Sequence, residues 1–173
     1  MSSPFAFCLL PVTVFSSPSR TPRADILVID DTPDNLNLLS AMLTDQGYKV
    51  RSVTTGLRGA QVAPPDLILL DINMPEMNGY EVCQQLKADD RTYEIPVIFI
   101  SALEDVLDKV RAFSVGGVDY ITKPFQIEEV LARIENHLTI RRLQKQLQEQ
   151  NLRLKQEMQE RQRAEEKFTK AFR

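Results

Sequence analysis

Acidic side chains, a hydroxyl and an amine follow the short apolar runs of this sequence. Asp30 and Asp31 come directly after the first run, Asp71 and Ser101 end two later runs, and Lys123 stands just after the last. Clustered carboxylates repel one another, and Mg²⁺ is a cation that binds a few of them while leaving room for a phosphate. A lysine supplies positive charge for phosphate oxygens, and a serine hydroxyl can donate to one. These residue types predict an aspartyl-phosphate site, in which an aspartate attacks phosphorus.

The elements that must position these side chains alternate between strand and helix. Five runs are expected to form strands: 26–29, 49–53, 67–70, 96–100 and 118–121. Five segments are expected to form helices: 33–46, 56–63, 79–88, 104–114 and a last one that starts near Gln126. The alternation predicts an α/β fold with a parallel sheet covered by helices on both faces. Ligands of such sheets bind outside the carboxyl ends of the strands, so the side chains are expected to meet there.

A single aspartate after a strand has an ordinary alternative, because it is often only the N-cap of the next helix. That alternative holds for any one of these residues taken alone. It does not explain why carboxylates, a hydroxyl and an amine all fall at strand ends, so the combination favours one shared site.

The charge of the chain is unevenly distributed. Residues 24–137 hold 9 Lys/Arg and 19 Asp/Glu, whereas residues 138–173 hold 10 Lys/Arg and 5 Asp/Glu. This contrast predicts an acidic domain at 24–137 and a separate basic tail at 138–173. The two cysteines, Cys8 and Cys83, are too few for a disulfide scaffold and fit a cytoplasmic protein.

The first 23 residues are expected to form a flexible extension. Residues 5–15 are apolar, but the run is interrupted by Pro11 and is shorter than the roughly 20 residues that span a membrane. No basic residue precedes it, so it makes a poor signal peptide. We therefore expect no membrane association.

Four segments resemble the receiver domains of response regulators in two-component signalling: Val28–Asp31, Leu70–Gly79, Ile100–Ala102 and Lys123–Phe125. The separations also match those of the family, with 30 residues from Asp71 to Ser101 and 22 from Ser101 to Lys123. The resemblance covers residues 24–137. It implies a doubly wound, five-stranded, flavodoxin-like sheet with strand order 2-1-3-4-5.

The resemblance also implies roles for eight residues. They are the phosphoacceptor Asp71; the Mg²⁺ ligands Asp30, Asp31, Asp71 and the carbonyl of Asn73; the phosphate-binding residues Lys123, Ser101 and Ala102; and the switch residues Ser101 and Tyr120. The bond between Lys123 and Pro124 is expected to be cis. The phosphoryl donor would be a histidine kinase or phosphotransfer protein, and the domain would catalyse its own phosphorylation and dephosphorylation.

Two positions invite separate interpretations. Leu103 stands where relatives often carry a polar residue that helps to place the hydrolytic water, so it predicts a long-lived phosphoryl group. His137 is the only histidine, but its surroundings lack the pattern of a kinase phosphodonor, and we expect an ordinary histidine on a helix surface.

The C-terminal segment is expected to be one long helix. Neither Gly nor Pro occurs after Pro124. One heptad register places apolar residues at two alternating positions, namely Ile140, Leu147, Leu154 and Phe168 at one, and Met158 and Phe172 with Gln144 and Asn151 at the other. Arg161 and Glu165 weaken this pattern, and Leu143 and Leu152 fall outside it. We predict a marginal coiled coil that forms a homodimer, with a single solvated helix as the alternative.

The favoured function is a receiver that passes a conformational change through its last helix to a downstream output module. Residues 160–168 resemble linkers that precede sensory PAS domains, so the N-terminal part of a hybrid histidine kinase is one alternative. A phosphatase of related topology is another, but those enzymes carry a second Asp where this chain has Asn73. The basic tail mixes its charges with glutamates and glutamines, so direct binding of nucleic acid is not expected.

Overall fold

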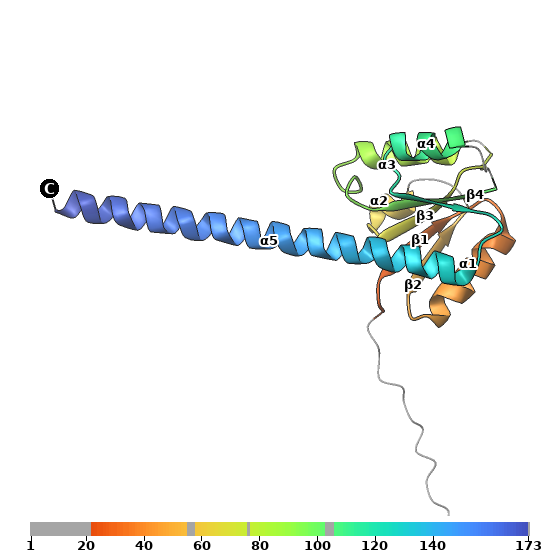
Figure 1. Ribbon diagram of the computed structural model, residues 1–173, viewed down its shortest axis with the longest axis horizontal. Helices are drawn as coiled ribbons and strands as arrows, with labels where there is room; N and C mark the ends of the chain where they lie inside the picture. The colour runs from red at the N-terminus through yellow and green to blue at the C-terminus, as the bar shows by residue number, and fades with distance from the viewer. Residues whose placement is uncertain (1–21, 55–57, 76, 103–105, 173) are drawn as a thin grey trace, which may run out of the picture.

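The structure, a computed structural model, describes residues 22–54, 58–75, 77–102 and 106–172. Its centre is a parallel sheet of five strands (Figure 1): β1 (Asp25–Ile29), β2 (Lys49–Val53), β3 (Leu67–Asp71), β4 (Val97–Ser101) and β5 (Asp119–Thr122). The strands lie in the order β2-β1-β3-β4-β5. The predicted doubly wound sheet and its order are confirmed.

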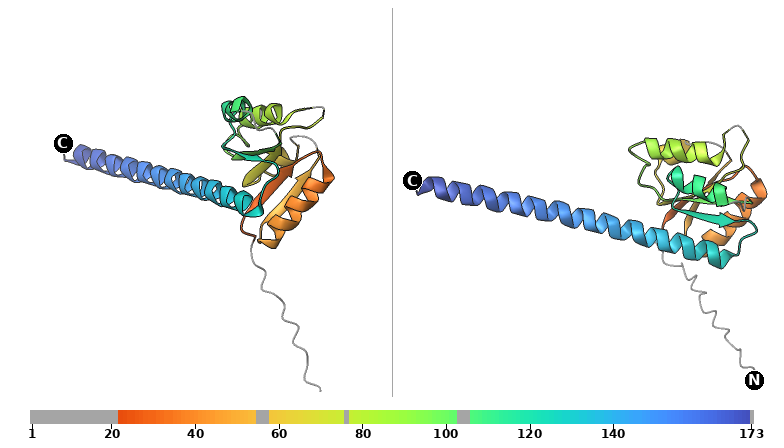
Figure 2. Two further views of the ribbon diagram at one scale, coloured as in Figure 1. Left: turned by 45° about the vertical axis from the view of Figure 1, so that its right-hand side comes forward. Right: turned by 45° about the horizontal axis from the view of Figure 1, so that its top comes forward.

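Five helices connect and cover the strands: α1 (Pro33–Asp45), α2 (Arg58–Val62), α3 (Gly79–Ala88), α4 (Val106–Ser114) and α5 (Ile127–Ala171). Figures 1 and 2 show α1 and the start of α5 on one face of the sheet and α3 and α4 on the other. The bounds agree with the sequence prediction to within two residues at every end that falls in the described residues.

Each strand contributes alternate residues to two separate cores. Ile26 and Val28 of β1 pack with the core beneath α1 and α5. Leu27 and Ile29 pack with the core on the side of α2, α3 and α4. Both faces of the central strands β1, β3 and β4 are buried, which is why these three are nearly continuous apolar runs rather than alternating ones.

Local signals fix the helices that follow the site. Pro33 lies at the first positions of α1, where its missing N–H costs nothing. Asn78 caps α3 through a reciprocal capping box with Glu81, in which each side chain accepts from the backbone N–H of the other residue. These caps define where the chain turns back after β1 and β3.

Helix α5 runs without interruption for 45 residues, which corresponds to about 68 Å. Val130 and Ile134 are its buried residues, and from Arg142 onward every described residue is exposed. The long helix is therefore confirmed, whereas its pairing with another helix stays a prediction. Among the described residues, none of the helices is both long and apolar enough to cross a lipid bilayer.

Candidate functional site

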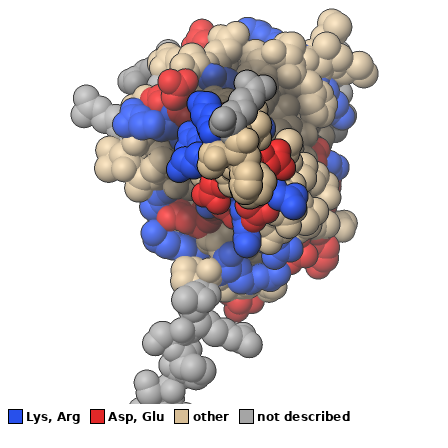
Figure 3. Space-filling view, turned by 90° about the vertical axis from the view of Figure 1, so that its left-hand side faces the viewer, with Lys and Arg blue, Asp and Glu red and all other residues tan. Residues whose placement is uncertain are grey.

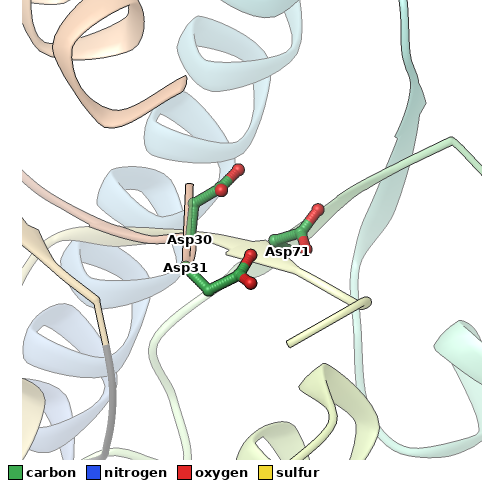
Figure 4. A group of neighbouring side chains, drawn as sticks. All are labelled: Asp30, Asp31 and Asp71. Carbon is green, nitrogen blue, oxygen red and sulfur yellow. The ribbon is translucent and has the colours of Figure 1, made fainter. Parts of the chain in front are cut away.

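Three carboxylates meet at the carboxyl ends of β1 and β3 (Figure 4). Asp30 and Asp31 follow β1, and Asp71 is the last residue of β3. One oxygen from each of the three lies within 4.8 Å of the others. The sheet brings them together because β1 and β3 are neighbouring parallel strands, with Ile29 in register with Leu70.

The fourth and fifth strands supply the amine and the hydroxyl. Ser101 ends β4 and is fully buried. Lys123 follows β5, and its Nζ lies 2.7 Å from Asp71 Oδ1 and 3.0 Å from Asp30 Oδ2. The backbone N–H of Lys123 donates to the carbonyl of Ser101 at 2.8 Å, which ties the two strand ends together. The peptide bond from Lys123 to Pro124 is cis, as predicted.

Asp30 is held by two neighbours besides Lys123. The backbone N–H of Thr32 donates to its Oδ1 at 2.9 Å, and Asn35 Nδ2 lies 3.1 Å from each of its carboxylate oxygens. The side chain of Asp30 is only 3% exposed. Sequence reasoning missed Asn35. The signal that could have identified it as a neighbour of Asp30 is its position in the first turn of the helix after the acidic pair.

Burial and repulsion set the protonation of this cluster. Burial raises the pKa of Asp71, and the charges of Asp30 and Asp31 act in the same direction, while Lys123 opposes them. Burial also disfavours the charged form of Lys123, but its hydrogen bonds to Asp71 and Asp30 outweigh that effect and raise its pKa. The ammonium therefore stays charged against an excess of carboxylates.

This donor set fits a magnesium ion. Three carboxylate oxygens close together are hard ligands of the kind that Mg²⁺ prefers, and one ammonium does not neutralise them. Asp31 is less buried than Asp30 and Asp71, so the cluster opens toward solvent on its side. A dication would offset the repulsion from Asp30 and Asp31, which adds to burial in raising the pKa of Asp71.

The loop after β3 folds tightly beneath the site. The backbone N–H of Gly79 donates to the carbonyl of Ile72 at 2.9 Å. A Cβ at Gly79 would collide with the backbone carbonyl of Asp71 and come within 2.9 Å of the Ile72 Cα. Glycine is therefore required where α3 begins. In the same loop, Asn73 Nδ2 lies 3.5 Å from Ser101 Oγ, at the limit of a hydrogen bond.

Tyr120 lies beside the site in β5. Its side chain belongs to the core under α3 and α4, and it is 6% exposed. Burial raises its pKa, and a hydrogen bond with Ser101 acts in the opposite direction. The ammonium of Lys109 lies 5.6 Å from the centroid of its ring. The two residues predicted to form the switch are thus neighbours in the core.

The remaining residues singled out in the sequence have different outcomes. Ala102 is exposed directly after β4. Leu103 lies outside the described residues.

The expectation of an ordinary surface histidine at His137 is wrong, because its side chain is only 13% exposed and its Nε2 lies 2.9 Å from Asp119 Oδ2. Arg133 also binds Asp119, at 2.6 Å, so β5 and α5 are joined by an ionic cluster that spacing alone could not reveal.

Comparison with known proteins agrees with this geometry. Residues 26–135 match the family model described as "Response regulator receiver domain". A DNA-binding dual master transcriptional regulator, RpaA from Synechocystis, is 45% identical over 112 residues, which cover 63% of this chain and 46% of that protein. A probable cyclic di-GMP phosphodiesterase from Vibrio cholerae is 39% identical over 132 residues, which cover 75% of this chain and 30% of that protein.

A solved structure shows the same fold. The receiver domain of a signal transduction histidine kinase from Syntrophus aciditrophicus is 34% identical, with a TM-score of 0.63 over 67% of this chain and 90% of that one. This chain spans less than half the length of the two relatives described above. The matched family model and the five-stranded sheet with its acidic edge lead to one conclusion: the chain belongs to the response regulator receiver domains of two-component signalling.

Proposed function

We propose that Asp71 accepts a phosphoryl group from a histidine kinase or phosphotransfer protein. The observation that carries this proposal is the position of its carboxylate, buried at the end of β3 and 2.7 Å from the ammonium of Lys123. In the transfer, a carboxylate oxygen of Asp71 forms a bond to phosphorus. The bond from phosphorus to the imidazole nitrogen of the donor breaks, and the imidazole leaves with the electron pair.

The residues around Asp71 have separate tasks. Asp30, Asp31, Asp71 and the backbone carbonyl of Asn73 would hold Mg²⁺, which supplies positive charge for the phosphoryl oxygens when it is bound. Lys123 is already hydrogen-bonded to Asp71 and can pair with a phosphoryl oxygen instead. Ser101 Oγ can donate to another oxygen, and the backbone N–H of Ala102 offers a further donor beside it.

Transmission would run from Ser101 through β5 to α5. Ser101 and Tyr120 are neighbours, and β5 is bound to α5 through Asp119 and His137. A dianionic phosphoryl group that draws Ser101 and Lys123 toward itself changes the packing around Tyr120. The response would be a shift between two packed states of this region, transmitted along α5 to a downstream output module.

The same proposal covers the roles of the other segments of the chain, its location in the cell and the module that follows it. Residues 24–137 would act as the receiver and residues 138–173 as a helical linker that forms a homodimer, with residues 1–23 as a flexible extension. The protein would work in the cytoplasm and bind no nucleic acid directly through its tail. The downstream module could be a kinase or a cyclic-dinucleotide enzyme, which would make the chain the N-terminal part of a larger hybrid protein.

Labelling with acetyl phosphate tests the phosphoacceptor. The parent chain is expected to gain one phosphoryl group in the presence of Mg²⁺ and none after chelation, as measured by intact mass. The Asp71→Asn variant is expected to stay unlabelled, while a matched Asp66→Asn variant, changed at the opposite end of β3, labels like the parent. Equal labelling of Asp71→Asn and the parent would overturn the assignment.

A phosphatase is the second candidate, since it would use the same buried aspartate and metal. The position of its general acid, two residues after the nucleophile, is occupied by Asn73. We therefore expect no turnover of a phosphomonoester such as p-nitrophenyl phosphate under conditions where Asp71 is labelled. Sustained turnover that requires Asp71 would favour the phosphatase.

A further inference from the structure

A cleft lies at the point where α5 leaves the receiver domain. It has a volume of about 500 Å³, and its walls come from the residues before β1, β2 and β3 and from one face of α5. The strands of the parallel sheet begin at this edge and end at the opposite one, where Asp71 ends β3. The cleft is therefore separate from the proposed phosphoacceptor site, and the proposed function assigns it no role.

The cleft carries an excess of positive charge. Four cationic side chains and two carboxylates line it: Arg23, Arg141, Arg142 and Lys145, with Asp66 and Glu135. Four cations against two carboxylates leave a formal charge of +2. Figure 3 views the molecule along α5 from its C-terminal end, and Lys and Arg side chains gather in the lower part of this face. A hollow lined mainly by one sign of charge concentrates ions of the opposite sign, so this cleft attracts anions.

Two of these cations, Arg142 and Lys145, have no partner in the part of the chain that the structure describes. Neither takes part in an ion pair or a hydrogen bond there. Arg23, in contrast, is paired with Glu135 at 2.7 Å, and Arg141 donates to a backbone carbonyl just before β3 at 3.0 Å. Because residues three apart on a helix lie on the same side, one anion can contact both Arg142 and Lys145.

Tyr48 adds an unused hydrogen-bond donor to the wall of the cleft. The residue is only 4% exposed, yet its hydroxyl makes no hydrogen bond with any described residue. None of the fully buried side-chain nitrogen or oxygen atoms in the described ranges lacks a partner, so this hydroxyl must reach the space of the cleft that Tyr48 lines. Burial raises the pKa of Tyr48, which keeps the hydroxyl protonated and able to donate at neutral pH.

We propose that the cleft binds a small phosphate ester, whose phosphate group contacts Arg142, Lys145 and the hydroxyl of Tyr48. A phosphate carries nearly two negative charges at neutral pH and three acceptor oxygens, which match the charge of the cleft and its three unused donor groups. A monocarboxylate would neutralise only one of the two cations. A volume of about 500 Å³ is larger than a phosphate needs and is typical of small-molecule sites, and Ala24 and Leu138 offer apolar surface for the organic part.

A bound ester would connect α5 to the body of the domain. Arg142 and Lys145 belong to the exposed part of the helix, whereas Tyr48 directly precedes β2. A phosphate held by all three limits the movement of α5 at the point where it leaves the sheet. The cleft would thus provide a second input to the long helix, at the edge of the sheet opposite Asp71.

Isothermal titration calorimetry of the full chain in EDTA tests the cleft with three probes: adenosine 5′-monophosphate, glucose 6-phosphate and inorganic phosphate. EDTA removes Mg²⁺, so the carboxylates around Asp71 repel a phosphate and do not contribute. At least one ester is expected to bind as one molecule per chain with a Kd below about 1 mM, and inorganic phosphate should bind about tenfold more weakly. The tighter ester identifies the organic group. Binding of neither ester in this range, or of inorganic phosphate as tightly as the esters, would overturn the proposal.

A pair of double variants tests the two cations. Arg142→Gln/Lys145→Gln is expected to weaken binding of the tighter ester at least about tenfold, because both charge-assisted contacts to the phosphate are lost. The matched control Arg163→Gln/Lys167→Gln removes the same two charges from the part of α5 beyond the cleft and should bind like the parent. Equal weakening by both double variants would show a general effect of charge and contradict a site in the cleft.

Tyr48→Phe tests the third contact by removing the hydroxyl alone. Binding of the tighter ester is expected to weaken about three- to tenfold, while the urea midpoint of unfolding stays unchanged because the hydroxyl has no protein partner to lose. Binding equal to that of the parent would refute the placement of the phosphate beside Tyr48. Labelling of Asp71 by acetyl phosphate should proceed in all these variants as in the parent, so failure of the cleft proposal is distinguishable from failure of the phosphoacceptor assignment.

Discussion

Replacing Lys123 by Met provides a sensitive test of the charge balance at the site. Lys123 makes ion pairs of 2.7 and 3.0 Å with Asp71 and Asp30, whose side chains are only 5% and 3% exposed. Breaking a buried pair costs about 3–5 kcal/mol because a charge is left without a partner. The lysine is 22% exposed, so solvent screens part of this effect, and we expect a loss of about 2–3 kcal/mol.

The assay is urea unfolding of the full chain in EDTA, followed by circular dichroism. Because the free energy of unfolding falls by about 1–3 kcal/mol per molar urea, the urea concentration at the midpoint of unfolding should fall by roughly 1–2 M. The matched control is Lys49→Met, which removes an ion pair of 2.8 Å to Asp25 at a site where the lysine is 57% exposed, and it should cost less than about 1 kcal/mol. Excess Mg²⁺ should reduce the deficit of Lys123→Met, since a dication replaces the lost positive charge.

Two results would refute this reasoning. If the free energy of unfolding of Lys123→Met in EDTA is within about 0.5 kcal/mol of that of the parent, the two carboxylates do not depend on the ammonium for stability. If Lys49→Met loses as much as Lys123→Met, burial is not what gives the site its sensitivity. Either result would also weaken the case for a cluster with excess negative charge that recruits magnesium.

Three other measurements probe the domain away from the site. Burial opposes ionisation of Asp25, but hydrogen bonds and charges from the basic residues of β2 outweigh it and lower its pKa below 3.8. Asp25→Asn should therefore be less stable than the parent by about 1 kcal/mol at pH 7, and this difference should be lost as the pH falls below about 4. Gly117→Ala should destabilise the domain by about 1–3 kcal/mol in the same unfolding assay, since its Cβ would lie 2.5 Å from the Phe99 ring. Burial raises the pKa of Cys83 to about 11, so in a Cys8→Ser background its thiol should react with a disulfide reagent at pH 8 only as fast as the domain opens, and rapid modification of the folded chain would contradict this.

The sequence predicted the sheet and the main site residues because their signals are local. A continuous apolar run marks a strand that is covered on both faces, and the polar residue at its end marks the carboxyl edge. Asp71 and Ser101 each end such a run, so their strands could be located without any knowledge of tertiary contacts. The parallel arrangement then placed both residues at one edge.

Contacts between distant segments could not be predicted in this way. His137 was expected to be a surface residue because its surroundings lack the pattern of a kinase phosphodonor, but it lies against Asp119 at the start of β5. Nothing in the spacing of two residues 18 positions apart shows that a strand and a helix will join there. Asn35 was missed for a related reason, since its amide acts only after α1 has turned back over Asp30.

The first part of α5 is attached to two different strands of the sheet. Arg133 and His137 bind Asp119 of β5, while Arg141 donates to the backbone carbonyls of Pro65 and Asp66, which immediately precede β3. The same helix is thus attached to β5, which contains the proposed switch residue Tyr120, and to the residues just before β3, which ends in the proposed phosphoacceptor Asp71. A relative movement of these strands must bend α5, rotate it or break one attachment, and a stiff helix passes rotation to its far end with little loss. We therefore expect phosphorylation at the proposed site to change the orientation of the exposed part of α5 relative to the sheet.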